Sequence, residues 1–218
     1  MTTDTAHIAW NAAWATEEGR AAWETPAPQV VDALTAAKLS GAVSALDVGC
    51  GVGRHALAMA QLGFETTALD ASDNGLEMLR GRAGALGVSV NTRQGMMTAL
   101  PFADAAFDFT LSWNVIYHGD PLVVHKTAAE LTRVTKPGGR MLITMLSKRR
   151  HDYGRGVEVA KDTFVQPGAP GDKSHPHFFV GAADLLALFP GFETLSLVDN
   201  EGAKSGTWHF EFLATRVG

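Results

Sequence analysis

The sequence predicts an α/β fold with a doubly wound, mostly parallel sheet, and three observations support this. An apolar run at 43–48 breaks into Gly49, Gly51 and Gly53 and passes at once into a helical apolar pattern. Strand-like and helix-like segments then alternate along most of the chain, which is typical of parallel strands joined by crossover helices. Two last strands, joined by a short polar segment, predict an antiparallel C-terminal hairpin.

The periodicity predicts seven strands and five helices. The strands are expected at 43–48, 65–70, 88–92, 106–112, 140–146, 192–198 and 207–214. The helices are expected at 28–39, 54–62, 73–86, 120–134 and 184–189, the third of them capped by Ser72 or Asp73. Residues 147–179 break this rhythm with glycine, proline and short apolar runs, and we expect them to form a long binding loop or lid.

The front of the chain is predicted to be a helical cap on the main domain. Residues 6–22 form a weak helical pattern, and two prolines break the chain before the helix at 28–39. We therefore divide the chain into an N-terminal cap at 1–40 and a main domain at 41–218, which form one compact unit.

Composition limits the class of protein. The chain has 218 residues and a formal net charge of −5, which argues against a nucleic-acid partner, because phosphates require a basic face. No apolar stretch is long enough to cross a membrane, and the start has no signal-peptide pattern. The single Cys50 excludes an intrachain disulfide, so we expect a cytoplasmic protein that has no membrane partner. The oligomeric state is not predicted.

The glycine turn at 49–53 predicts a nucleotide-type cofactor site. Glycines allow a ligand to lie on the backbone, and the following helix start offers free N–H groups. Gly51 to Ala56 also fits the G-x-G-x-x-A dinucleotide fingerprint, with Asp70 near the spacing of a ribose-binding acid. Asp47 favours another ligand, because a carboxylate there would repel a pyrophosphate but would suit the amino group of S-adenosylmethionine.

Four segments in order make the chain similar to the class I S-adenosylmethionine-dependent methyltransferases. They are Leu46–Gly53, Leu69–Ser72, Leu100–Phe109 and Thr135–Gly139. The resemblance covers roughly residues 28–215. It implies a Rossmann-like seven-stranded sheet and S-adenosyl-L-methionine as the cofactor, with S-adenosyl-L-homocysteine as its product.

The resemblance assigns the cofactor-binding residues. Asp47 would bind the amino end of the cofactor, and the turn glycines Gly49, Gly51 and Gly53 would lie beneath its methionine part and ribose. Asp70 would accept both ribose hydroxyls, and Ala71 would border the adenine. Met96 stands where the family usually has an acid, so the adenine contact is expected to differ, with the backbone N–H of Met97 as a partner for the ring.

The acceptor is expected at the end of the strand at 106–112. Asn114, Tyr117 and His118 follow that strand, and in the family this edge faces the transferred methyl. His118 is the candidate general base, because the pKa of histidine lies near neutrality. The alternative is a histidine that caps the next helix or packs under the loop.

Trp14, Trp23 and His177 are the candidate substrate-binding residues. Trp10, Trp14 and Trp23 either anchor the cap or form an apolar roof over the pocket, and the front segment loosely resembles methyltransferases of the tellurite-resistance, thiol and thiopurine kind. His175 and His177 are not expected to bind a metal, because metal sites need three or four ligands and no third ligand has a matching spacing.

The predicted function is methyl transfer to a small-molecule acceptor through an S, Se, N or O nucleophile. A nucleic-acid or protein methyltransferase is the alternative. An NAD-dependent oxidoreductase is disfavoured, because Asp47 would repel its pyrophosphate and no Tyr-x-x-x-Lys motif occurs. A non-catalytic cofactor-binding subunit is also left open.

Overall fold

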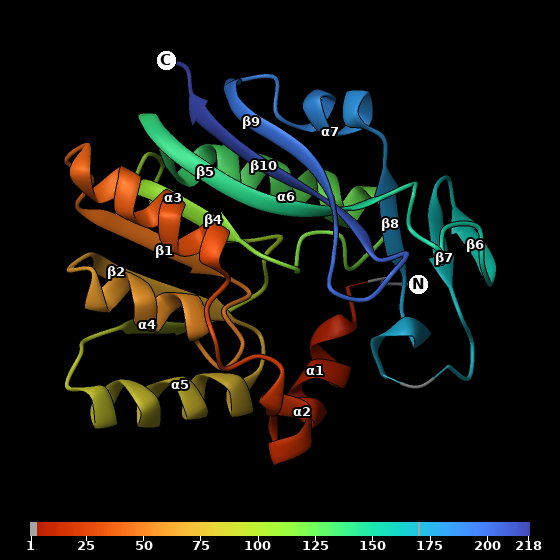
Figure 1. Ribbon diagram of the computed structural model, residues 1–218, viewed down its shortest axis with the longest axis horizontal. Helices are drawn as coiled ribbons and strands as arrows, with labels where there is room; N and C mark the ends of the chain where they lie inside the picture. The colour runs from red at the N-terminus through yellow and green to blue at the C-terminus, as the bar shows by residue number, and fades with distance from the viewer. Residues whose placement is uncertain (1–3, 170) are drawn as a thin grey trace.

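The computed structural model describes residues 4–169 and 171–218 and is built around one mixed sheet (Figure 1). Seven of its strands are those expected from the sequence: β1 Ser44–Val48, β2 Glu65–Asp70, β3 Asn91–Gln94, β4 Phe107–Ser112, β5 Thr135–Ser147, β9 Phe192–Glu201 and β10 Trp208–Arg216. They run in the spatial order β3-β2-β1-β4-β5-β10-β9. The pairs from β3 to β5 are parallel, and β10 is antiparallel to both of its neighbours. The predicted α/β, Rossmann-like fold is confirmed.

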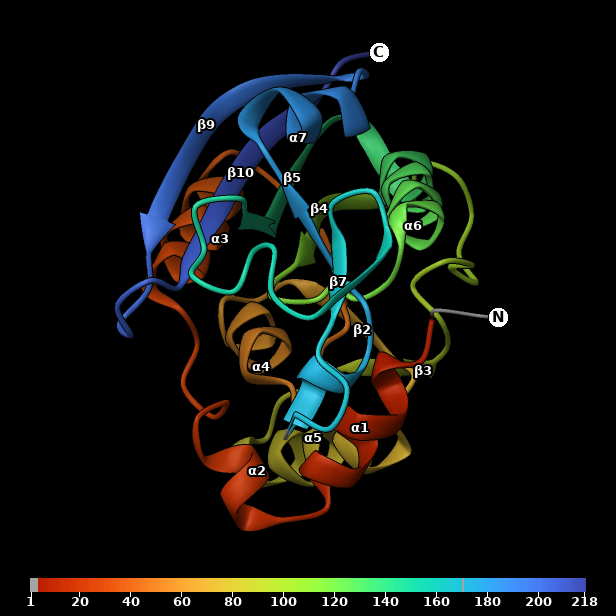
Figure 2. The same cartoon turned by 90° about the vertical axis from the view of Figure 1, so that its right-hand side faces the viewer.

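Helices cover both faces of this sheet. Figure 2 shows α3 (Pro28–Leu39) and α6 (Pro121–Val134) on opposite faces. Neighbouring residues of β1 alternate between the two cores, since Ala45 packs with the α3 cluster and Leu46 with the α6 cluster. The other helices are α1 Ala6–Trp14, α2 Glu17–Ala21, α4 Arg54–Gln61, α5 Asp73–Leu86 and α7 Ala182–Leu188.

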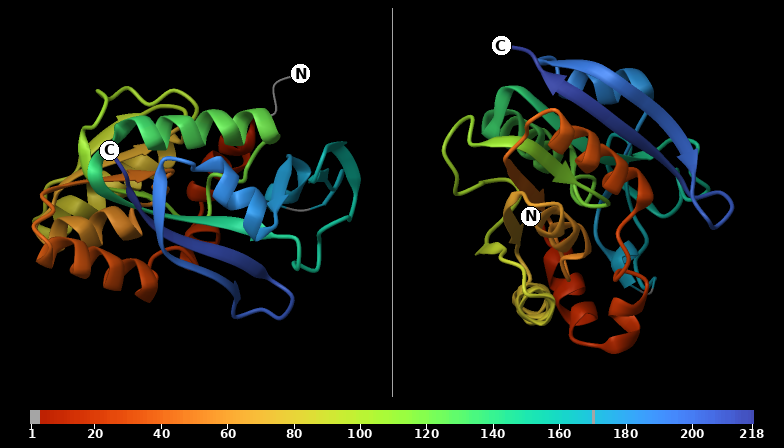
Figure 3. Two further views of the ribbon diagram at one scale, coloured as in Figure 1. Left: turned by 90° about the horizontal axis from the view of Figure 1, so that it is seen from above. Right: turned by 60° about the vertical axis from the view of Figure 1, so that its left-hand side comes forward.

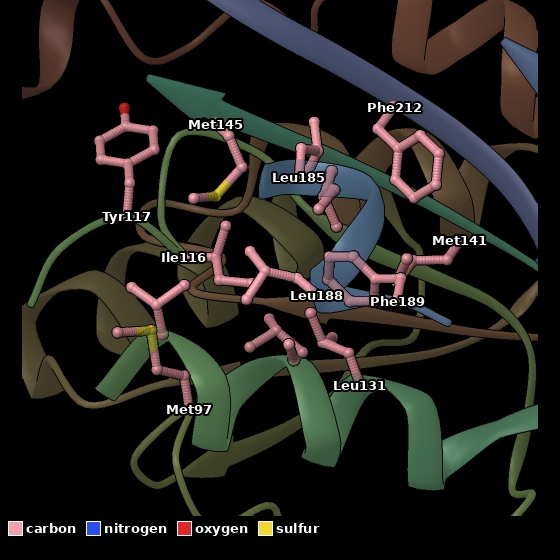
Figure 4. Close-up of a cluster of buried hydrophobic side chains, with 14 of the residues drawn as sticks. Met97, Ile116, Tyr117, Leu131, Met141, Met145, Leu185, Leu188, Phe189 and Phe212 are labelled. Carbon is pink, nitrogen blue, oxygen red and sulfur yellow. The ribbon is translucent and has the colours of Figure 1, made fainter. Parts of the chain in front are cut away.

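The larger core lies between the sheet, α6 and α7. Leu131 of α6, Leu188 of α7 and Phe212 of β10 meet there, as Figure 4 shows. Leu131 is fully buried and Phe212 is almost so. Ile116 and Tyr117 belong to this core, so it holds the loop between β4 and α6, which carries the expected acceptor-side residues.

The segment 147–179 differs from the predicted loop. It contains β6 Val157–Ala160, β7 Thr163–Val165 and the 3-10 turn η1 Gly171–Ser174, and it ends in β8 His177–Val180. Strand β8 pairs in parallel with the end of β5, and β7 pairs antiparallel with β8, so the described residues form ten strands rather than seven. These strands stand beyond the end of α6 in Figure 3. Their runs of three or four residues are too short to show strand periodicity in the sequence.

The front of the chain divides into two parts. Helix α3 packs in the sheet core through Val30, Ala33, Leu34 and Ala37. Helices α1 and α2 lie instead at the edge where the parallel strands end (Figure 1). The side-chain oxygen of Asn11 accepts hydrogen bonds from Ser72 Oγ and from the Asn74 N–H, which ties α1 to the start of α5.

No helix among the described residues is long and apolar enough to span a bilayer.

Candidate functional site

The glycine turn after β1 has the backbone conformation that the sequence predicts. Gly49, Gly51 and Gly53 have φ angles of 73°, 52° and 83°, in the left-handed region that favours glycine. A Cβ at Gly49 would lie 2.4 Å from Val115, and one at Gly53 would lie 2.2 Å from Leu79. The turn therefore presses against the loop after β4 and against α5.

Asp70 holds this turn at the end of β2. Its Oδ2 accepts the Gly51 N–H at 2.7 Å, and its Oδ1 accepts the Ser72 N–H at 2.8 Å. Burial raises the pKa of Asp70, although these hydrogen bonds oppose the shift. Each carboxylate oxygen has a second lone pair, so the side chain can still accept hydrogen bonds from a ligand.

Asp47 lies buried beneath the same turn, with 2% of its surface exposed. Burial raises its pKa to about 7, with a smaller contribution from the charge of Asp70, while Arg54 lowers it. Within the described part of the chain its Oδ2 has no hydrogen-bond partner. A buried carboxylate oxygen without a partner is costly, and a cationic group nearby would lower that cost.

A pocket of about 820 Å³ opens above the turn and collects most of the predicted cofactor residues. The predicted residues that line it are Gly49, Gly51, Asp70, Ala71, Met96, Met97, Asn114, His118, Trp14 and Trp23. Asp47 and Gly53 are not among its lining residues. Asp47 is buried near the end of β1, and Gly53 is the N-cap of α4.

A second pocket of about 760 Å³ adjoins the first. Trp10, Trp23 and Asn114 line both. Aromatic side chains and charged or polar side chains both line the second pocket. The charged and polar lining residues include Arg150, Asp152, Asp172, Lys173, His177 and His209. Tyr117 and His177, both predicted from the sequence, line this second pocket.

The tryptophans of the cap roof the first pocket. Trp10 and Trp14 stack with ring centroids 4.9 Å apart, and Trp23 meets both edge-on. Trp14 is only 6% exposed, and a Cβ at Gly51 would lie 2.9 Å from its ring. The tryptophans thus both anchor the cap and line the site.

The loop after β4 brings three predicted residues to the junction of the pockets. Asn114 has a φ of 61°, unusual for a residue other than glycine, and its N–H donates to Thr144 Oγ1 at 2.7 Å. Burial raises the pKa of the Tyr117 hydroxyl, which therefore stays protonated at neutral pH. Burial and the neighbouring histidines hold the pKa of His118 well below its usual range, so His118 is neutral there.

The structure brings two further ligand-type side chains to the His175 and His177 pair. His118 Nδ1 lies 3.0 Å from His175 Nε2, and Asp172 Oδ2 lies 3.5 Å from His177 Nε2. One ligand atom from each of the four residues fits within 4.8 Å of all the others. Sequence spacing did not show this proximity, because His118 is 57 residues away from His175 in the chain.

Arg54 and Arg150 are site residues that the sequence analysis did not identify. Arg54 begins α4, lines the first pocket and lies over the Trp23 ring at 5.0 Å. Arg150 lines the second pocket and pairs with Asp152 at 2.8 Å. The position of Arg54 directly after the glycine turn could have identified it as a site residue from the sequence. No sequence feature identified Arg150.

Cys50 lies buried in the turn, and burial raises the pKa of its thiol. A protonated, buried thiol is a poor nucleophile, so Cys50 acts as a small packing residue.

Comparisons with known proteins agree with this geometry. Residues 45–139 match the family described as a methyltransferase domain. The ubiquinone biosynthesis O-methyltransferase of Dinoroseobacter shibae is 33% identical over 117 residues, which are 53% of this chain and 46% of that protein. The demethylmenaquinone methyltransferase of Renibacterium salmoninarum is 31% identical over 69% of this chain and 62% of its own length. The chain spans about half the length of the first of these curated relatives.

Solved structures share the fold. The 1,6-didemethyltoxoflavin-N1-methyltransferase of Burkholderia thailandensis superposes with a TM-score of 0.72 at 18% identity, covering 98% of this chain and 89% of that one. TehB of Haemophilus influenzae superposes with a TM-score of 0.67 at 22% identity, covering 88% of this chain and 62% of that one.

Fold, glycine turn and family match together define a methyltransferase domain. These findings support the class I S-adenosylmethionine-dependent methyltransferase superfamily, and the match to the methyltransferase-domain family spans residues 45–139.

Proposed function

We propose that the protein transfers a methyl group from S-adenosylmethionine to a small-molecule acceptor. One observation carries the proposal: the buried carboxylate of Asp47 and the half-buried carboxylate of Asp70 flank the glycine turn at a pocket that adjoins a second, polar pocket. The first pocket would hold the donor and the second the acceptor. A path between them exists at Asn114, which lines both.

The residues of the first pocket fit S-adenosylmethionine. Asp70 has lone pairs free for the ribose hydroxyls, and the unpartnered Oδ2 of Asp47 suits the ammonium group. Arg54 suits the carboxylate at the same end of the molecule, because it lines the pocket at a helix N-terminus. When bound, the cofactor supplies an electrophilic methyl group on its sulfonium.

The adenine side of the pocket is apolar. Ala71, Met96 and Met97 line it, and Asp4, an acid that lines the same pocket beside them, accepts a hydrogen bond from Thr98 Oγ1 at 3.1 Å. We assign the adenine contact to methionine packing and to the Met97 backbone N–H.

The residues at the junction would position the acceptor. Tyr117 stays protonated and can donate a hydrogen bond, and the Asn114 side chain lies near Thr144 Oγ1 at 3.3 Å. His118 is neutral and can accept a hydrogen bond from the acceptor, but its lowered pKa makes it a weak base, so we propose it as base only for an acceptor that loses its proton readily. Methyl transfer by in-line displacement requires the acceptor atom about 3 Å from the methyl carbon in a site without bulk water, and the tryptophan roof excludes water.

The second pocket favours a small aromatic acceptor with a polar substituent. Trp10 and Trp23 offer flat apolar faces, while Arg150 and Lys173 offer hydrogen-bond donors. The relatives named for ubiquinone and demethylmenaquinone also act in quinone chemistry. We therefore propose that the methyl group goes to a nucleophilic atom on a small aromatic acceptor, and that this atom is oxygen rather than S, Se or N.

A labelled-methyl screen tests the proposed function. Phenols, aromatic amines, thiols and chalcogen oxyanions are each incubated with the protein and methyl-labelled S-adenosylmethionine. Label is expected in a phenol or a related aromatic hydroxyl compound. Transfer only to thiols or oxyanions would overturn the acceptor class, and transfer only to nucleic acid or protein would overturn the small-molecule function.

Arg54→Gln is expected to weaken binding of S-adenosylhomocysteine about 10- to 100-fold while leaving adenosine binding within about twofold. The reason is that a hydrogen bond to a charged group contributes about 1.5–3 kcal/mol, and adenosine has no carboxylate. Calorimetric titration of both ligands measures this. Arg93→Gln, on β3 outside the pocket lining, is the control; an equal loss for both ligands would contradict the assignment.

A further inference from the structure

Three histidines and one aspartate converge in the wall between the two pockets. They are His118, Asp172, His175 and His177, which we call the histidine cluster. His118 lines the first pocket, and Asp172 and His177 line the second. His118 and His175 are buried, and the other two are half-buried.

The backbone fixes the histidines of this cluster. The N–H of Gly119 donates to the Pro176 carbonyl at 2.9 Å, and the N–H of Phe178 donates to the Tyr117 carbonyl at 2.9 Å. His118 and His177 face each other as an antiparallel bridge. Two segments far apart in sequence are thus joined before any ion arrives, which is the preorganisation that a metal site needs.

The separations suit a tetrahedral ion. Zinc–nitrogen bonds of about 2.0–2.1 Å in a tetrahedron place neighbouring ligand atoms about 3.3 Å apart. The distances of 3.0 Å between His118 and His175 and 3.5 Å between His177 and Asp172 lie on either side of that value. Rotation of the half-buried side chains would bring the remaining distances, at most 4.8 Å, into range.

The hydrogen bond of His177 determines which of its ring nitrogens can bind an ion. Its Nδ1 lies 2.9 Å from the His175 carbonyl oxygen, which can only accept, so Nδ1 carries the proton. In the neutral ring the lone pair is then on Nε2, which faces the Asp172 carboxylate at 3.5 Å. Two acceptors facing each other need a cation between them, and a carbonyl that orients a histidine in this way is the usual support of a metal ligand.

Asp172 forms no ion pair with a lysine or arginine in the part of the chain that the structure describes, and it pairs with His177 when the ring of His177 is protonated, so a metal ion would take the place of that proton. Among the described residues, Arg150 and Lys173 form their ion pairs with Asp152, at 2.8 and 3.6 Å, and neither pairs with Asp172. The carboxylate therefore remains for an ion.

We propose that the histidine cluster binds one divalent transition-metal ion, with zinc favoured by three imidazoles and one carboxylate. The ion would join η1 to the loop after β4 and so fix the wall of the second pocket. With the ion bound, His118 is a ligand and not a base, because a neutral imidazole has one lone pair. Metal binding does not depend on methyl transfer, so either proposal can fail alone.

The test is a zinc titration of the full chain without an affinity tag, after removal of metal by a chelator. Competition with a chromophoric chelator measures affinity, and mass spectrometry under native conditions measures stoichiometry. We expect one zinc per chain, a raised thermal unfolding midpoint and no comparable binding of magnesium, which prefers oxygen ligands. Cobalt in place of zinc is expected to give the visible absorption of a tetrahedral site.

Two variants and one control keep the outcome interpretable. His175→Ala and Asp172→Asn are each expected to lower zinc affinity at least about 100-fold, more than loss of a supporting contact does. Asp172→Asn keeps the size of a half-buried side chain, so it also covers the case in which His175→Ala fails to fold. His125→Ala, at an exposed position on α6, should bind zinc as the parent does. Absence of stoichiometric zinc binding, or unchanged affinity in Asp172→Asn, would overturn the proposal.

Discussion

Replacing Asp70 with alanine is expected to weaken binding of S-adenosylmethionine about 100-fold or more. The carboxylate would bind the ribose hydroxyls, and it also holds the N–H groups of Gly51 and Ser72. Hydrogen bonds to a charged group contribute about 1.5–3 kcal/mol each, so the loss should reach about 3 kcal/mol. Calorimetric titration with S-adenosylmethionine and with adenosine measures it, and both ligands should lose affinity because both carry the ribose.

Asp73→Ala is the matched control for this variant. Asp73 is an exposed aspartate three residues further along, at the start of α5, and it does not line the pocket. Its replacement should leave the affinity for S-adenosylmethionine within about twofold of the parent's. If Asp70→Ala stays folded by circular dichroism and still binds as the parent does, its assignment to the ribose is incorrect.

Asp47→Asn is expected to change the pH dependence of both stability and binding. The pKa of Asp47 is raised from 3.8 to about 7 in the folded protein. Between these values the folded state holds a proton that the unfolded state has lost, so the stability of the parent falls as pH rises from about 4 to about 7. Asparagine does not titrate, so the unfolding free energy of the variant relative to the parent should rise over that interval by up to about 4 kcal/mol.

Binding should change in the opposite sense. The ammonium of the cofactor favours ionised Asp47, so the parent should bind S-adenosylhomocysteine more tightly than the variant does. The ratio of the two affinities should increase up to about pH 7 and stay constant at higher pH. Adenosine has no ammonium and should not distinguish the two proteins. Urea unfolding and calorimetry at pH 5, 6, 7 and 8 measure both effects; a variant that parallels the parent at every pH would contradict this account of Asp47.

The donor site was largely predictable because its chemistry is local in sequence. Three glycines within five residues, an acid before them and Asp70 after the next strand fix a turn whose shape depends on backbone conformation. Strand β3 begins three residues later than predicted, and β5 begins at Thr135, before the glycine turn, because Thr135 already pairs with Phe107 of β4. Such errors concern the ends of elements, where the periodic pattern is weakest.

The acceptor side was less predictable because its residues are distant in sequence. Arg150, Asp172 and His209 reach the second pocket from three different segments, and only the pairing of β8 with β5 brings the first two there. The short strands β6 and β7 have no clear periodicity, so the segment 147–179 was interpreted as a loop. The histidine cluster depends on the bridge between His118 and His177, which are far apart in sequence, and for this reason His175 and His177 alone gave no metal signal.

The central claim is that the glycine turn binds S-adenosylmethionine, and a comparative calorimetric titration tests it most directly. S-adenosylmethionine, S-adenosylhomocysteine and NAD are titrated separately into the parent protein and into Asp70→Ala. The account predicts one site per chain for the first two ligands and no measurable binding of NAD. In Asp70→Ala, binding of S-adenosylmethionine and of S-adenosylhomocysteine should be lost. Binding of NAD in preference to the other two, or no binding of either adenosyl ligand, would contradict it.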